Sequence, residues 1–122
     1  MRILLIGAGG VGSAFVAISR RRDFFEACVV ADHDEARAQK AVAEAADPRY
    51  VAAQVDASDA ASVTALCREH GITHVMNAVD PVFNMSIFEG AFEAGADYAD
   101  MAMSLSKPHP EPPYEKIGRA HV

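Results

Sequence analysis

Residues 3–12, Ile-Leu-Leu-Ile-Gly-Ala-Gly-Gly-Val-Gly, decide the fold of this chain. A four-residue apolar run is typical of a buried parallel strand, and here it breaks into glycines at once. Apolar residues then return at helical intervals, at Val11, Ala14, Phe15 and Ile18. Because Gly7, Gly9 and Gly12 stand in G-x-G-x-x-G spacing between the two patterns, the stretch predicts a strand, a tight turn and a helix.

Each of the three glycines has a physical role in such a turn. Gly7 permits the bend, Gly9 lets a pyrophosphate approach the backbone, and Gly12 lets the helix pack close to the strand. Free N–H groups at the start of the helix favour phosphate. The alternative is a plain strand-to-helix turn without a ligand. We expect a bound dinucleotide, contacted by Gly7, Ala8, Gly9, Gly10, Val11 and Gly12.

A carboxylate follows at the distance that a ribose contact requires. Asp32 ends a second apolar run and comes about 20 residues after Gly12, where a carboxylate accepts from the adenosine ribose hydroxyls. It would repel a 2′-phosphate, so we expect NAD rather than NADP, although His33 and Arg37 nearby partly offset that repulsion. We place Asp32 and His33 in the cofactor site. The alternative for Asp32 is a simple loop or cap aspartate.

Strand and helix patterns alternate through the rest of the chain. Apolar runs predict strands at 3–6, 27–31, 50–55, 73–78 and 97–101, with helices after the first four. This alternation is typical of a parallel sheet with helices on both faces. We expect a single α/β domain, a doubly wound parallel sheet of the Rossmann type with strand order 3-2-1-4-5.

The helices carry their own end signals and apolar faces. Asp34 is the expected cap of the helix over 35–46, and Ser58 that of the helix over 59–70. The apolar face of the latter helix is predicted to be Val63, Leu66 and Cys67. The inward face of the helix over 84–94 is predicted to be Ile87, Phe88, Ala91 and Phe92.

Two more strand ends complete the predicted cofactor site. In this strand order the carboxyl end of the third strand faces the adenine, so Asp56 and Ala57 are candidates there. Asp56 either accepts from the adenine amino group or simply starts the next turn. Asn77 and Ala78 end the fourth strand, across from the glycines, which places them near the nicotinamide ribose. Their alternative role is turn formation.

Composition narrows the class of protein. The chain has 122 residues and a net charge of −6, and no basic patch alternates with aromatic residues, so we expect neither nucleic acid nor a membrane surface as a partner. Cys28 and Cys67 have neither C-x-x-C spacing nor a disulfide framework. They are expected to be buried apolar residues in a reducing compartment, the cytoplasm, and no metal site is expected.

The chain resembles the N-terminal nucleotide-binding domain of the saccharopine dehydrogenase and saccharopine reductase family. The likeness rests on the glycine stretch, on Asn77-Ala78-Val79 followed by Pro81, Phe83 and Asn84, and on residues 93–100, Glu-Ala-Gly-Ala-Asp-Tyr-Ala-Asp. The resemblance implies nicotinamide-dependent oxidoreduction at a C–N bond: a secondary amine such as saccharopine is oxidised to an imine, which is hydrolysed to glutamate and 2-aminoadipate semialdehyde, or the reverse. It also implies that the catalytic residues, which stay unknown here, lie in a second domain.

The resemblance also suggests how the chain is organised. We expect a Rossmann domain over 1–106, a proline-rich exit over 107–116 toward a missing substrate domain, and a non-native tail over 117–122, which looks like a translated sequencing adapter. An amino-acid substrate is then the partner of the full-length protein, and the open edges of the sheet leave a homo-oligomer open. The alternative function is a stand-alone NAD-sensing regulatory domain of a transporter.

Overall fold

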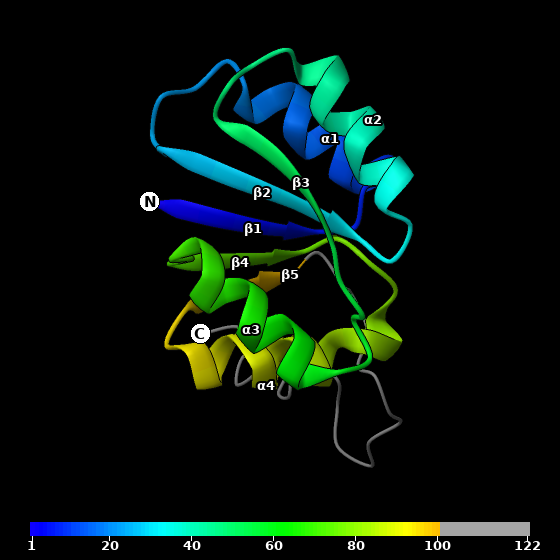
Figure 1. The fold of residues 1–122 in the computed structure, drawn as a ribbon, viewed down its shortest axis with the longest axis vertical. Coiled ribbons are helices and arrows are strands. Elements are labelled where there is room, and N and C mark those ends of the chain that lie inside the picture. The colour runs from blue at the N-terminus through cyan, green and yellow to red at the C-terminus, as the bar shows by residue number, and fades with distance from the viewer. Residues whose placement is uncertain (101–122) are drawn as a thin grey trace, which may run out of the picture.

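The computed structural model describes residues 1–100, and Figure 1 shows a sheet with helices on both sides. The strands are β1 (Arg2–Ile6), β2 (Ala27–Asp32), β3 (Tyr50–Gln54), β4 (His74–Asn77) and β5 (Asp97–Asp100). The helices are α1 (Gly10–Ser19), α2 (Glu35–Ala45), α3 (Ala60–His70) and α4 (Asn84–Ala94), with a 3-10 turn, η1 (Pro81–Phe83), before α4. The expectations for residues 101–122 lie outside the described residues.

The strands pair in parallel in the order β3-β2-β1-β4-β5, which confirms the predicted sheet. β1 lies between β2 and β4, so the chain changes direction across the sheet beside β1. At this switch point the connections that follow β1 and β4 lead to helices on opposite faces of the sheet, and ligands of open α/β sheets bind in the crevice that results. The glycine turn leaves β1 at that end of the sheet.

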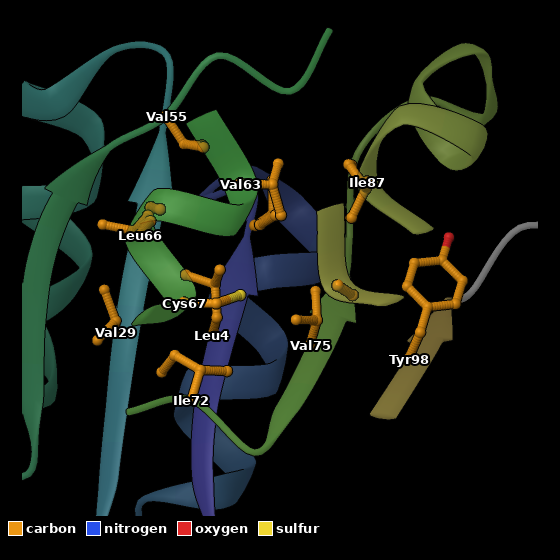
Figure 2. Packing of buried hydrophobic residues seen from close by; sticks show 13 residues of the cluster. Leu4, Val29, Val55, Val63, Leu66, Cys67, Ile72, Val75, Ile87 and Tyr98 are labelled. Atoms are coloured by element: carbon orange, nitrogen blue, oxygen red, sulfur yellow. The ribbon is translucent and has the colours of Figure 1, made fainter. Parts of the chain in front are cut away.

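The two faces of the sheet carry separate apolar cores, because side chains of a strand alternate between its faces. Ile3 and Leu5 pack with α1 and α2, whereas Leu4 and Ile6 pack with α3 and α4. Figure 2 shows the second core, in which Val63, Leu66 and Cys67 of α3 lie over the strands. Strands buried on both faces explain why the first two runs are continuously apolar.

Two predictions about the helices need correction, and the apolar pattern of α1 is only partly buried. Asp59, not Ser58, caps α3, because the Asp59 carboxylate accepts from the Ala61 N–H at 3.0 Å. Phe92 is 73% exposed, so it does not face the core, although Ile87 and Ala91 of the same helix are buried. In α1 the buried residues are Gly12, Val16 and Ser19, whereas Val11 and Ile18 of the apolar pattern are exposed.

Other local predictions are confirmed. Asp34 caps α2 through the Ala36 N–H, and Cys28 and Cys67 are buried free thiols. Burial raises the pKa of Cys28 to about 12 and that of Cys67 to about 11, so both stay protonated at neutral pH. None of the helices within residues 1–100 is long and apolar enough to cross a membrane.

Candidate dinucleotide-binding site

The glycine turn has the geometry that its spacing predicts. Gly7 adopts a φ of +106°, a region that side chains disfavour, and its N–H donates to the Ala31 carbonyl at 2.7 Å. A Cβ on Gly12 would lie 1.8 Å from the Gly7 carbonyl oxygen, so α1 touches the end of β1. A Cβ on Gly9 or Gly10 would meet nothing within 4 Å, which leaves the outer side of the turn open.

The start of α1 is suited to an anion. Gly9 is the N-cap residue and has no side chain to bond the first-turn amides, and the first turn carries no acidic residue. The first N–H groups of a helix have no partner within it, and they lie at the positive end of the helix dipole. The open turn and its uncapped amides together form a cradle of the kind that binds phosphate.

Asp32 lies beside this cradle, at the end of β2. It is 4% exposed, and one carboxylate oxygen accepts from the Ala8 N–H at 2.9 Å while the other accepts from the Asp34 N–H at 3.0 Å. His33 Nδ1 is 3.1 Å and Arg37 Nη1 is 3.9 Å from the carboxylate. The bond to Ala8 ties the carboxylate to the glycine turn, so the two predicted halves of the site are physically joined.

Burial by itself raises the pKa of Asp32, but the N–H groups of Asp34 and Ala8, together with the charges of Arg37 and His33, outweigh it. The net pKa lies below the ordinary value of 3.8. Asp32 is therefore ionised at neutral pH. A negative charge at this position attracts hydroxyl donors and repels a phosphate.

This shift predicts an acid-dependent loss of stability. A carboxylate whose pKa is lowered by folding stabilises the native state in full above its unfolded pKa, near 3.8, and loses that effect as the pH falls through the lower folded value. We expect the difference in unfolding free energy between wild type and Asp32→Asn to shrink below about pH 4. Urea unfolding at a series of pH values measures it, and a constant difference down to the acid limb would contradict the assignment.

A cleft of about 350 Å³ lies next to Asp32 at the carboxyl ends of the strands. It brings together four of the predicted site residues, Asp32, His33, Asp56 and Ala57. Val79 and Phe83, which follow β4, form part of its lining and were missing from the predicted site. Both residues lie in the segment that connects β4 to α4, at the switch point. That position in the chain could have predicted them as lining residues.

Asp56 starts the turn after β3, as one of its two alternatives proposed. Its Oδ1 accepts from the N–H and the hydroxyl of Ser58, and these bonds lower the pKa of Asp56. Asp56 also lines the cleft. Its other alternative, a hydrogen bond with the adenine amino group, stays a prediction.

Asn77 forms a turn, as one of its two alternatives proposed, and its place near the nicotinamide ribose stays a prediction. Its side chain is 1% exposed, and its amide donates to Asn84 Oδ1 at 2.9 Å and to the Tyr98 hydroxyl at 3.0 Å, while its oxygen accepts from the Val79 N–H at 3.0 Å. These protein partners use both amide hydrogens, so the side chain shapes the turn after β4 instead of reaching into the crevice. The neighbouring Ala78 N–H donates to the Ile6 carbonyl, which ties that turn to the end of β1.

Residues 1–100 hold no group of three or more His, Cys, Asp and Glu side chains arranged to bind a metal ion. The polar side chains that line the cleft are those of Asp32, His33, Asp56 and Ser58. Carboxylates of this kind can accept hydrogen bonds from the hydroxyls of a sugar.

Comparisons with known proteins agree with this geometry. Residues 3–117 match the family model described as the saccharopine dehydrogenase NADP binding domain. The carboxyaminopropylagmatine dehydrogenase of Synechocystis is 26% identical over 101 residues, which cover 83% of this chain and 25% of that protein. The chain thus spans about a quarter of the length of this curated relative.

Solved structures share the fold. Saccharopine dehydrogenase (L-Glu forming) from Saccharomyces cerevisiae superposes with a TM-score of 0.71 at 17% identity, over 89% of this chain and 22% of the other. The UDP-glucose 4-epimerase of Thermus thermophilus, solved in complex with NAD, has a TM-score of 0.62 at 18% identity, over 99% of this chain and 47% of the other.

The family match supports a nicotinamide cofactor, and the curated relative is an oxidoreductase. Neither finding favours the alternative function of a regulatory NAD sensor. The resemblance inferred from the glycine stretch and the Asn77 turn is confirmed. The chain belongs to the family of saccharopine dehydrogenase NADP-binding domains.

Proposed function

We propose that this chain is the NAD-binding part of an oxidoreductase that acts on the C–N bond of a secondary amine derived from an amino acid. The observation that carries the proposal is the bond between the Asp32 carboxylate and the Ala8 N–H, which fixes a buried negative charge beside the uncapped start of α1. A dinucleotide needs both groups, because its diphosphate is anionic and its ribose donates hydroxyl hydrogens.

Each part of the site has a proposed task. The diphosphate lies against the open glycine turn, at the amides of Gly9 to Gly12. Asp32 accepts from the adenosine ribose, with His33 at the rim, and the adenine enters the cleft lined by Asp56 and Ala57. The turn at Asn77 and Ala78, which is bonded to the end of β1, is proposed to face the nicotinamide ribose with its backbone, because the Asn77 side chain is held by protein partners. When bound, the nicotinamide ring supplies hydride transfer, and the chain contributes binding, orientation and electrostatics.

The cofactor is proposed to be NAD rather than NADP. Asp32 is ionised, and a 2′-phosphate bound beside it would add further negative charge. The side chains of Arg37 and His33 are 51% and 79% exposed, and each has a nitrogen within 4 Å of the Asp32 carboxylate. Because they already face this negative charge, they would attract a 2′-phosphate less strongly. We expect NADP to bind, but more weakly than NAD.

The proposed reaction follows the family. The matching carboxyaminopropylagmatine dehydrogenase is named for a substrate that contains an amine, and the C–N bond reaction is the chemistry that the resemblance implies. The described residues offer a cofactor cleft, and we propose that substrate binding and the catalytic residues come from a further domain of the whole protein. The chain by itself is then expected to bind cofactor without turnover.

Calorimetry of the 122-residue chain with NADH and with NADPH tests the proposal. We expect NADH to bind more tightly, and NADH at about 100 times its Kd to raise the free energy of unfolding by about 2.7 kcal/mol. Saccharopine added with NAD should give no NADH absorbance. Tighter binding of NADPH would overturn the choice of cofactor, and amine oxidation by this chain alone would overturn the need for a further domain.

A further inference from the structure

A chain of hydrogen bonds runs from the last described strand to the cofactor cleft. The Tyr98 hydroxyl on β5 donates to Asp100 Oδ2 at 2.7 Å and accepts from the Asn77 amide at 3.0 Å. Asn77 Oδ1 in turn accepts from the Val79 N–H at 3.0 Å, and its second amide hydrogen is held by Asn84 at the start of α4. Three elements, β4, α4 and β5, are thereby joined at one buried amide.

Val79 is the residue through which these bonds reach the cofactor site. It lines the same cleft as Asp32. Its Cγ1 lies 2.7 Å from the position that a Cβ on Gly7 would take, so Val79 also packs directly over the glycine turn. A shift of the Val79 backbone would therefore move the cleft wall and loosen the contact with Gly7 together.

The Tyr98 hydroxyl is not needed to fill the core. The ring already packs edge-on against Phe88, with ring centroids 5.5 Å apart, and a phenylalanine ring would occupy the same volume. Figure 2 shows the Tyr98 ring at the margin of the apolar cluster. The Tyr98 side chain is only 7% exposed, and burying a hydroxyl costs free energy unless the hydroxyl is hydrogen-bonded. The two hydrogen bonds of the Tyr98 hydroxyl offset that cost.

We propose that Tyr98 is a positioning residue for the dinucleotide: through Asn77 it holds Val79 in the place that forms the cleft wall. This inference rests on the proposed function, because it assumes that a dinucleotide occupies the cleft. Asp100 supports the same bond from the other side, since it accepts the hydroxyl hydrogen and so leaves the Tyr98 oxygen free to accept from Asn77.

The test is the Tyr98→Phe variant of the 122-residue chain, with Tyr50→Phe as the matched control. Tyr50 is also a buried tyrosine, and its hydroxyl bonds Ser19 Oγ at 2.6 Å in the other core, against α1. Both variants lose one buried hydroxyl, with two hydrogen bonds in Tyr98→Phe and one in Tyr50→Phe, so both should lower the Tm, and Tyr98→Phe should lower it more. Calorimetry with NADH, well below either Tm, then compares the Kd values.

We expect Tyr98→Phe to weaken NADH binding about fivefold, the effect of about one hydrogen bond, and Tyr50→Phe to bind NADH as wild type does. Equal Kd values for all three proteins, or equal weakening in both variants, would overturn the positioning role while leaving the proposed function standing. A wild type that binds neither NADH nor NADPH would instead refute the proposed function and this inference with it.

The Asn84→Ala variant tests the same hydrogen-bonded turn from α4, should Tyr98→Phe fail to fold. Asn84→Ala removes the other acceptor of the Asn77 amide from a half-buried position at the start of α4. We expect a similar weakening of NADH binding from this change. A wild-type Kd in Asn84→Ala would overturn the role of the hydrogen-bonded turn.

Discussion

The Gly12→Ala variant is expected to lose much of its folding stability. An added Cβ would lie 1.8 Å from the Gly7 carbonyl oxygen and 2.8 Å from the Gly7 carbonyl carbon, and both are backbone atoms that cannot rotate away. Either α1 moves off the sheet or the turn at Gly7 opens. Overpacking of this kind costs roughly 1–3 kcal/mol or more, which lowers the Tm of a domain of this size by roughly 4–20 °C.

Thermal unfolding measures this effect, and Gly10→Ala is the matched control. A Cβ on Gly10 meets nothing within 4 Å, and alanine is the better helix former, so that variant should melt at or slightly above the wild-type Tm. NADH binding adds a second measurement, because a displaced α1 would also displace the amides at its start. A Gly12→Ala protein with the wild-type Tm would show that α1 does not touch β1 as closely as described.

The second large effect is expected at Asp32, where Asp32→Asn should reverse the choice of cofactor. An asparagine keeps the shape of the side chain, but its NH₂ group would face the N–H of Ala8 or Asp34, both of which now donate to the carboxylate. The variant also lacks the charge that we propose accepts from the ribose. Hydrogen bonds to charged groups contribute about 1.5–3 kcal/mol, so NADH should bind roughly ten to a hundred times more weakly.

NADPH should respond in the opposite direction relative to NADH. Without the carboxylate, Arg37 loses the charge that lies 3.9 Å from its Nη1 and becomes free to pair with a 2′-phosphate. The ratio of the two Kd values, measured by calorimetry, is the decisive quantity. Asp34→Asn is the control, because it removes the same charge two residues away while keeping a residue suited to cap α2. An unchanged ratio in Asp32→Asn would remove Asp32 from the ribose site.

Local signals in the sequence were sufficient for the order of the elements and for one half of the site. The glycines after β1 and the carboxylate after β2 are tied to strand ends, and strand ends in a parallel sheet meet at one edge. The position of Asp32 beside Ala8 follows from that rule. Helix caps were less certain, because Ser58 and Asp59 are adjacent and both are good caps, and only the backbone geometry selects Asp59.

Contacts between distant segments were not accessible to the same reasoning. Gly90 attracted no prediction, yet a Cβ there would lie 2.6 Å from Val63 Cβ, so this glycine sets how closely α3 and α4 approach. Phe92 fits the helical period of α4, but α3 already packs on that helix along another side, and Phe92 is left exposed. Periodicity gives the face of a helix only when one neighbour covers it.

By itself the sequence determined the alternation of strands and helices, the parallel sheet, and the pairing of a glycine turn with a carboxylate, because these depend on side-chain period and on backbone freedom within a few residues. Only the tertiary structure decided that Asn77 is buried and bonded to Asn84 and Tyr98, and that Val79 and Phe83 line the cleft. Those contacts join segments that are distant along the chain, and they form only when the packing of the whole sheet has placed the strand ends.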